Sequence, residues 1–256
     1  GRLRAGATAN KYGITAGYLY KHRKSGVNIG LMYRSPVVSH MKGRAAFAFA
    51  GSSALTSFLP KDRGLDVVFP NQDIRATFVS PPTYAVGISK SDVWGGRMAF
   101  DYRFQQFDRF QDLAINFTKL TDSKGRITGT PAEQRIDFKF NNSYQLQVGF
   151  EKPFRSTGNG LLARVTKEVT WRTGYVYDHS PVPEQSIGPL FPDTNRHSWT
   201  IGFTKPVGSF DMSMYYQFMQ FINTSTNVDA NWSQFTNGEY RNFANLFGAG
   251  MRWRIG

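Results

Sequence analysis

The sequence contains no cysteine, so neither disulfide bonds nor thiolate metal sites are available to it. Its four histidines are scattered, and none has a metal-binding spacing such as HExxH. His179 does lie next to Ser180, but adjacency in a predicted loop does not provide the geometry of a catalytic triad. We therefore expect no enzymatic activity, no metal and no cofactor.

The sequence also lacks any run of about 18 apolar residues, which excludes a membrane-spanning helix. Its longest stretch with an apolar bias, residues 45–59, is interrupted by Gly51, Ser52 and Ser53. The first thirteen residues, GRLRAGATANKYG, have no hydrophobic segment of the kind found in a secretion signal. We expect from this start that the chain is cytoplasmic, already processed, or a fragment.

Positive charge and aromatic side chains are both plentiful. The 31 Lys and Arg exceed the 18 Asp and Glu, which gives a net charge of +13, and aromatic residues make up 15% of the chain. The mean hydropathy is nevertheless negative, at −0.41. This combination is typical of a membrane barrel in which aromatic side chains face lipid and every second residue faces water. Basic, aromatic chains also bind nucleic acid, but here the cations form no cluster, so no nucleic acid is expected.

The alternation of side chains predicts strands with one apolar and one polar face. In WGGRMAFDYRFQQF, starting at Trp94, one face carries Met98, Phe100, Tyr102 and Phe104. The opposite face carries Arg97, Ala99, Asp101 and Arg103. The stretches VTWRTGYVYD and GVNIGLMYR alternate in the same way and put Arg172 and Arg34 on the polar face. A soluble sandwich would alternate too, but runs of about 9 to 11 residues suit a membrane better than typical soluble strands of about 5 to 6.

We predict an all-β fold, an antiparallel transmembrane β-barrel, with nine strands in this chain. The predicted strands are 12–22, 26–38, 72–90, 94–118, 134–152, 162–178, 195–206, 208–222 and 244–256. The connections alternate in length, with short turns at 22–26, 89–94, 152–160 and 206–209. The long connections are predicted to be extracellular loops, at 39–71, 119–133, 178–194 and 223–243. Short turns on one side and long loops on the other are typical of outer-membrane barrels.

An odd number of strands is unexpected for a bacterial barrel, because these barrels have even numbers. The first predicted strand begins outside and the last ends in the periplasm. This parity predicts an odd number of further strands upstream. The alternative is a miscount by one.

Three motifs carry a resemblance to a known family. They are the strand exit YRS…KG at 33–43, the block from Arg172 to Trp199 containing YDHSPVPEQSIGPLFPDTNRHSW, and the SPP strand break at 80–82. Over nearly its whole length the chain resembles the FadL/TodX family of outer-membrane transporters for long-chain fatty acids and other hydrophobic compounds. The resemblance implies a fourteen-stranded barrel with an N-terminal hatch. Residues 1–256 would then form a partial barrel domain that holds the last nine strands and lacks the first five and the hatch.

The same resemblance implies passive uptake of hydrophobic molecules, foremost long-chain fatty acids, across the outer membrane of a Gram-negative bacterium. The integral protein would contact outer-membrane lipid and lipopolysaccharide. The alternative is a FadL-like barrel that has lost transport and serves as an accessory or structural subunit, in which case a protein partner is expected.

A fatty acid needs an apolar surface for its tail and a cation for its carboxylate, which arginine binds in a bidentate manner. The candidate carboxylate ligands on the polar face are Arg97, Arg103, Arg172 and Arg34. In the alternative interpretation, these arginines pair with acidic residues that line the pore. Those acidic residues are Asp101, Asp137, Asp178 and Glu151.

The loops contribute two further candidates. The predicted loop 39–71 offers an apolar surface for substrate capture, or else a helix or hairpin that packs on the barrel mouth; its apolar residues are Phe47, Phe49, Leu55, Phe58 and Leu59. In the loop 178–194, prolines fix the backbone, and Asp178, Asp193 and Arg196 are expected to brace its ends. At Pro81 and Pro82 we expect a local bend in a strand, because proline removes a hydrogen-bond donor from the sheet.

Overall fold

Strands form nearly all of the regular structure in the computed structural model, which describes residues 2–48, 72–117, 132–154, 160, 168–188, 192–226 and 238–254. The two short exceptions are the 3-10 helices η1 (Phe107–Arg109) and η2 (Glu184–Ser186). Within these described ranges, no helix is both long and apolar enough to cross a membrane. The chain divides into two compact units, and each contains one large antiparallel sheet.

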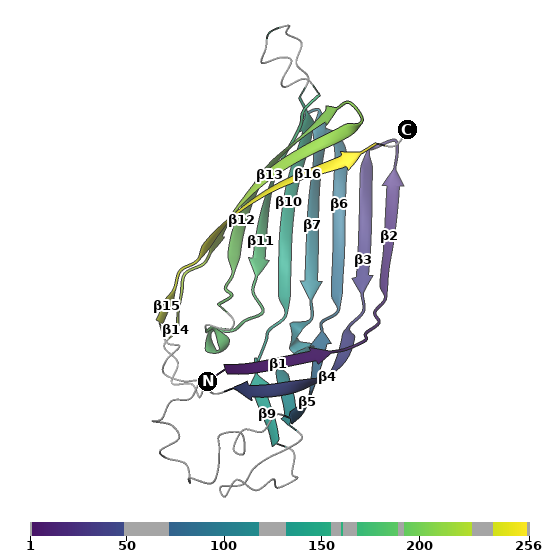
Figure 1. Cartoon of the computed structure of the whole chain (residues 1–256). Helices are drawn as coiled ribbons and strands as arrows, with labels where there is room; N and C mark the ends of the chain where they lie inside the picture. The colour runs from purple at the N-terminus through teal and green to yellow at the C-terminus, as the bar shows by residue number, and fades with distance from the viewer. Residues whose placement is uncertain are drawn as a thin grey trace, which may run out of the picture. The chain divides into compact units, whose positions relative to one another are not determined.

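The larger unit contains a nine-stranded sheet, which matches the predicted strand number and the all-β antiparallel class. Its order is β16-β13-β12-β11-β10-β7-β6-β3-β2, and Figure 1 shows these strands side by side. Their bounds are Thr15–His22 (β2), Val27–Arg34 (β3), Thr83–Val93 (β6), Gly96–Gln105 (β7), Ser143–Pro153 (β10), Thr170–His179 (β11), Arg196–Val207 (β12), Phe210–Phe221 (β13) and Phe243–Trp253 (β16). All but β2 and β3 have 10 to 12 residues, and a tilted strand needs about 9 to 11 to cross a bilayer.

The smaller unit contains a five-stranded sheet in the order β1-β4-β5-β8-β9. Its strands are Arg2–Thr8 (β1), Val37–Ala48 (β4), Gln72–Ser80 (β5), Asp112–Phe117 (β8) and Ala132–Asp137 (β9). Beside this sheet, the buried ring of Phe110 packs against Phe78 and Phe138, with ring centroids 4.7 and 5.1 Å apart. This unit therefore has a small aromatic core of its own.

Four of the predicted strands are too long, because each is divided between the two sheets. The divided strands are 26–38, 72–90, 94–118 and 134–152. Prolines explain the first two divisions: Pro36 follows β3, and Pro81 and Pro82 separate β5 from β6, where no backbone N–H is available to continue the ladder. The bend expected at 81–82 is thus a change of sheet.

The other two divisions coincide with η1, which separates β7 from β8, and with a left-handed residue between β9 and β10, Lys139 (φ 52°). Neither division carries a proline signal in the sequence.

Parts of the predicted long loops form β-strands instead. The loop 39–71 begins inside β4, and the loop 119–133 ends inside β9. The loop 223–243 contains a two-stranded hairpin, β14 (Thr224–Thr226) with β15 (Gly238–Tyr240). These corrections have one cause: backbone pairing continues beyond the segments where apolar and polar side chains alternate clearly.

The strand register places the short turns at one end of the nine-stranded sheet. The closing pairs are His22 with Val27, Val93 with Gly96, and Val207 with Phe210. Gly95 and Gly208 adopt positive φ angles of 72° and 58° in two of these turns, a conformation that glycine adopts without a steric cost. The β10–β11 connection lies at the same end but runs from 154 to 169, so the strand predicted to start at 162 begins at Thr170.

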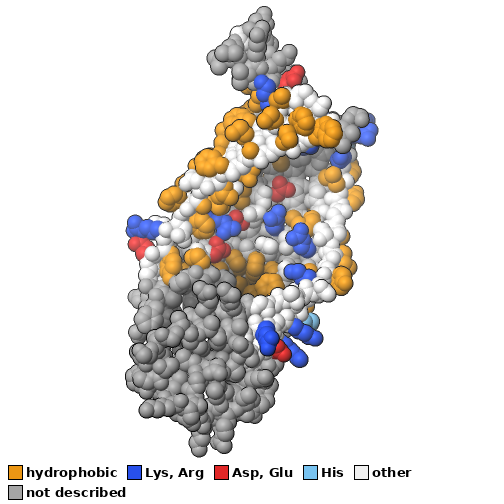
Figure 2. All heavy atoms as spheres, in the orientation of Figure 1, with side chains coloured by type: hydrophobic (Ala, Val, Ile, Leu, Met, Phe, Trp, Pro, Cys, Tyr) orange, Lys and Arg blue, Asp and Glu red, His pale blue; other side chains and the backbone are white. Residues whose placement is uncertain are grey.

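Antiparallel register gives the nine-stranded sheet two chemically distinct faces. We call the face that carries Met98, Phe100, Tyr102 and Phe104 the apolar face, and the face that carries Arg97, Ala99, Asp101 and Arg103 the polar face. Large side chains of the apolar face are exposed, among them Phe100 (45%) and Phe247 (79%). Figure 2 shows hydrophobic side chains along the strands and charged side chains gathered in a hollow beside them. Such an exposed apolar face suits lipid contact.

Candidate ligand-binding site

Two of the predicted arginines meet on the polar face across a shared carboxylate. Arg97 of β7 and Arg172 of β11 lie opposite Glu151 of the intervening strand β10. The Arg172 Nε lies 2.5 Å from Glu151 Oε2, and the Arg97 Nη2 lies 3.4 Å from Glu151 Oε1. Two guanidinium groups therefore compete for one carboxylate.

Arg172 is held from its other side by a short chain of hydroxyl groups. Its Nη1 donates to Thr204 Oγ1 at 2.6 Å, and Thr204 Oγ1 lies 2.9 Å from Ser213 Oγ. Arg97 makes only its one long ion pair in the part of the chain that the structure describes. A guanidinium has five N–H donors, so Arg97 keeps more donors available for a ligand than Arg172 does.

These charged groups line an open hollow of about 450 Å³ on the polar face. Its charged lining residues are Arg97, Asp101, Glu151 and Arg172, and its floor includes Gly149, Gly174 and Gly202. A Cβ atom at Gly174 would lie only 2.9 Å from Thr200 Oγ1. The hollow thus depends on small residues in the centre of the sheet.

The other two predicted arginines do not join this group. Arg103 lies six residues beyond Arg97 on β7, about 20 Å along the strand. Arg34 ends β3 and pairs with Thr83 in the backbone ladder. Neither forms an ion pair with the described residues. Of the four arginines predicted from the sequence, Arg97 and Arg172 therefore form one site, and the other two lie apart from it.

Tyr215 is a lining residue that the sequence analysis missed. It projects from β13 into the same hollow, and a Cβ at Gly248 of the neighbouring strand β16 would overlap its ring. The ring therefore covers the backbone of Gly248 in an arrangement known to compensate for glycine in strands. The alternation in FDMSMYYQF could have revealed it, because Tyr215 shares a face with Asp211 and Ser213.

The three residues expected to brace the loop 178–194 form one ion-pair cluster. Arg196 Nε lies 3.1 Å from Asp178 Oδ2, and Arg196 Nη1 lies 2.7 Å from Asp193 Oδ1. Ser180 adds a hydrogen bond from its hydroxyl to Asp193 Oδ2 at 2.8 Å. The loop is also tied to its neighbours, since Asn141 N donates to Pro181 O at 2.8 Å. The start and end of this loop are thereby held together.

Ser180 and His179 do not act on each other in this arrangement. The Ser180 hydroxyl bonds Asp193, whereas the His179 ring stacks on Tyr144 with centroids 4.7 Å apart. The adjacency noted in the sequence therefore gives no nucleophile and base pair.

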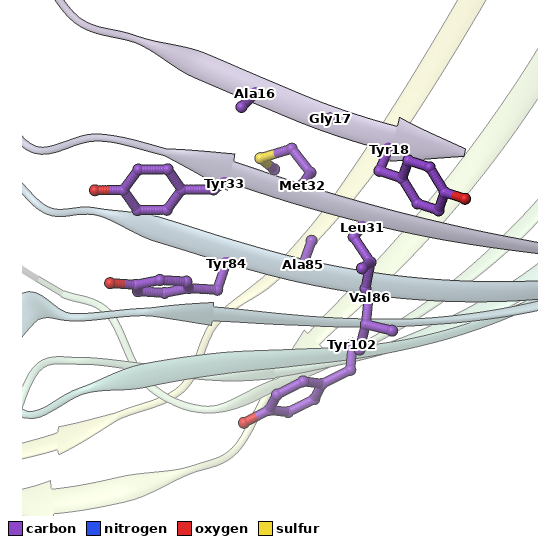
Figure 3. A pocket seen from close by; sticks show the side chains of 10 residues that line it. All are labelled: Ala16, Gly17, Tyr18, Leu31, Met32, Tyr33, Tyr84, Ala85, Val86 and Tyr102. Carbon is purple, nitrogen blue, oxygen red and sulfur yellow. The ribbon is translucent and has the colours of Figure 1, made fainter. Parts of the chain in front are cut away.

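A second hollow, of about 550 Å³, lies near the end of the sheet opposite the short turns and faces mainly the apolar side. In Figure 3 its aromatic side chains come from neighbouring strands, with the rings of Tyr33 and Tyr84 close together. Their centroids are 5.2 Å apart. The remaining apolar-face lining consists of Ala16, Tyr18, Leu31, Val86 and Tyr102. Tyrosines at the end of a lipid-facing surface are typical of the aromatic girdle at a membrane interface.

The predicted capture surface lies largely outside the described residues. Phe49, Leu55, Phe58 and Leu59 fall in the range 49–71, which the structure does not describe. Phe47 belongs to β4, but its side chain is likewise outside the description. Substrate capture by this segment remains a prediction.

The nine-stranded antiparallel sheet has an exposed apolar face, a polar face with a charged hollow, and short turns at one end. These features are typical of the outer-membrane barrel class. The sequence profile of the family described as outer membrane protein transport protein (OMPP1/FadL/TodX) matches residues 5–255. The chain belongs to this family, which confirms the resemblance seen in the three sequence motifs.

A solved structure of a FadL homologue shows the same fold. A crystal structure of a Pseudomonas aeruginosa FadL homologue is similar to this chain, with a TM-score of 0.62 and 15% identity, over 93% of this chain and 50% of that one. The CymD monoaromatic hydrocarbon channel gives a TM-score of 0.47 and 17% identity, over 84% of this chain and 46% of that one. The chain thus spans about half the length of each. No curated protein matches it.

Proposed function

We propose that the chain forms part of the wall of an outer-membrane channel for the passive uptake of hydrophobic molecules in a Gram-negative bacterium. The observation that carries this proposal is the division of one sheet into an exposed apolar face and a polar face with a charged hollow. The family assignment supports transport over the accessory-subunit role. It also supports a transport rather than a catalytic function.

We infer that the first substrate to test is a long-chain fatty acid, with its carboxylate at Arg97. Two guanidinium groups face the single carboxylate of Glu151, so this part of the hollow carries an excess of positive charge. The nearest further acid that lines the hollow, Asp101, is four residues from Arg97, about 13 Å along the strand. Arg172 would assist chiefly by holding Glu151 away from the ligand.

The loops would act at the extracellular side in this proposal. The segment 39–71 would collect the substrate, and the cluster of Asp178, Asp193 and Arg196 would keep the wall of the entrance in shape. Cations near these loops would meet the phosphates of lipopolysaccharide.

The test is binding of radiolabelled oleate, and of its methyl ester, to the full-length barrel in detergent. Arg97→Ala is expected to weaken oleate binding at least tenfold, because a hydrogen bond to a charged group contributes about 1.5 to 3 kcal/mol. Binding of the ester, which has no carboxylate, should not change. Arg103→Ala removes a cation from the same face outside the paired site and should leave oleate binding intact.

Two results would contradict separate parts of this proposal. Unchanged oleate binding in both Arg97→Ala and Arg172→Ala would reject the carboxylate site but leave the channel in place. Absence of uptake of any hydrophobic compound by cells or vesicles that contain the folded barrel would reject the channel itself.

A further inference from the structure

The apolar face of the nine-stranded sheet carries three lysines, and all of them lie beside the short-turn end. Lys90 lies opposite Met98, Lys152 opposite Trp171, and Lys205 opposite Met212 in the backbone ladder. In the regular pairs of these nine strands, no Asp or Glu falls on this face. Asp92 lies near the same end, at a β-bulge where the alternation lapses. We call Lys90, Lys152 and Lys205 the lysine row.

Aromatic side chains surround the lysine row and mark its depth in the membrane. The Trp94 ring lies 6.2 Å from that of Phe150, and the Phe150 ring lies 5.4 Å from that of Trp171, the residue opposite Lys152. Tryptophans gather at the level of the lipid headgroups. Lysines at this depth can extend their ammonium groups toward the headgroups while their stems stay on apolar surface.

A largely apolar hollow of about 610 Å³ includes the third lysine in its lining. Lys205 is its one charged lining residue, Ser213 is its one uncharged polar side chain, and the other side chains that line it are aliphatic, aromatic or sulfur-containing. They include Phe203, Val207, Met212, Met214 and Met251. A hydrocarbon chain fits such a lining, and Lys205 supplies a cation at its border.

The opposite end of the apolar face has no such lysines. Its last residues there are aromatic, with Tyr33, Tyr84 and Tyr144 on neighbouring strands and His179 beside them. The lysines of the apolar face therefore all lie at the depth of one leaflet of the membrane. Short turns of outer-membrane barrels lie on the periplasmic side, where the leaflet is made of glycerophospholipid rather than lipopolysaccharide.

We propose that the lysine row binds anionic glycerophospholipid from the periplasmic leaflet. The lipid phosphate would lie against the lysine ammonium groups, and one acyl chain would lie along the hollow beside Lys205. This site is on the outer wall, so it is separate from the substrate hollow on the polar face and does not depend on the identity of the substrate. It gives the barrel a fixed depth and orientation relative to that leaflet.

The experiment offers the full-length barrel in neutral detergent equal amounts of phosphatidylglycerol and phosphatidylcholine with identical acyl chains. Native mass spectrometry then counts each lipid retained. The wild type should retain phosphatidylglycerol preferentially. Since a lysine near an anionic surface contributes about 1 kcal/mol, each single Lys→Gln change should weaken this preference about fivefold, and the triple variant Lys90→Gln, Lys152→Gln, Lys205→Gln should lose it.

The matched control is Lys21→Gln, Arg23→Gln, Lys24→Gln, which removes the same charge at the same end of the sheet. Lys21 is on the polar face, and the other two belong to the β2–β3 turn, so this control should keep the wild-type preference. The corresponding triple Lys→Arg variant should keep it too, because arginine also binds phosphate. Heat-modifiable migration in gel electrophoresis verifies that each variant is folded.

Several results would overturn the proposal. These are equal retention of the two lipids by the wild type, a triple Lys→Gln variant that still prefers phosphatidylglycerol, or an equal loss in the control. Displacement of phosphatidylglycerol by equimolar lipopolysaccharide would instead assign the lysine row to the other leaflet, and would also reject it. If the triple variant does not fold, the three single Lys→Gln variants make the same test.

Discussion

Glu151 on β10 and Arg172 on β11 face each other with Nε 2.5 Å from Oε2, and the same carboxylate also faces Arg97 on the other side. All three side chains are partly exposed in the hollow. At such exposure, ion pairs contribute about 1 kcal/mol or less to stability. The arrangement therefore matters more for the charge it presents to a ligand than for the stability of the barrel.

Glu151→Gln should tighten oleate binding several-fold, because it removes the carboxylate that competes with the ligand for both guanidinium groups. Stability should fall by no more than about 1 kcal/mol, as expected for a partly exposed pair. Calorimetric titration of the full-length protein with oleate measures the first effect. Glu184→Gln, in η2 of the loop 178–194, serves as the control, and equal affinities in wild type and Glu151→Gln would contradict the prediction.

Arg196→Ala should loosen the loop 178–194, because it leaves the carboxylates of Asp178 and Asp193 without their shared cation. The expected cost is about 1 to 3 kcal/mol, since these side chains are partly buried. Faster backbone amide exchange and faster proteolysis within this loop would report it. Arg241→Ala breaks a more exposed pair with Glu239 and should cost less than about 1 kcal/mol. Equal behaviour of the two variants would count against bracing by Arg196.

Gly248→Val should displace the ring of Tyr215, because a side chain at this position would occupy the space that the ring now fills. We expect Tyr215 to move further into the hollow and weaken oleate binding. Gly250→Val is the matched control on the same strand, because nothing lies within 4 Å of a Cβ placed there. The prediction fails if the two valine variants bind oleate with the same affinity.

Val148→Arg and Gln147→Arg place the same charge on adjacent residues of β10 that point to opposite faces. Val148 pairs with Phe100 and Tyr175 on the apolar face, whereas Gln147 pairs with Asp101 on the polar face. An arginine facing lipid near the membrane midplane costs about 2 to 4 kcal/mol. Urea unfolding in lipid vesicles should therefore show a clear loss for Val148→Arg and little change for Gln147→Arg. Equal losses would reject the assignment of the two faces.

The alternation in β7 and β11 is enough to predict that Arg97 and Arg172 share a face, because side chains alternate along any strand. The pattern also predicts nine strands and the side of the short turns. It does not predict the divisions at 106–111 and 138–142, which lack a proline. There the change of sheet depends on which backbone groups find partners in distant strands.

The two faces and the excess of cations follow from residue type and local spacing, and the motifs of the chain are enough to place it in its family. Which charges meet depends on the tertiary structure. Arg97 and Arg172 share Glu151, and Arg103 does not, because cross-strand register joins residues more than 20 positions apart in the chain. The same register aligned Lys90, Lys152 and Lys205 at one end of the apolar face. No local pattern encodes a register, which is fixed by the packing and hydrogen bonding of whole strands.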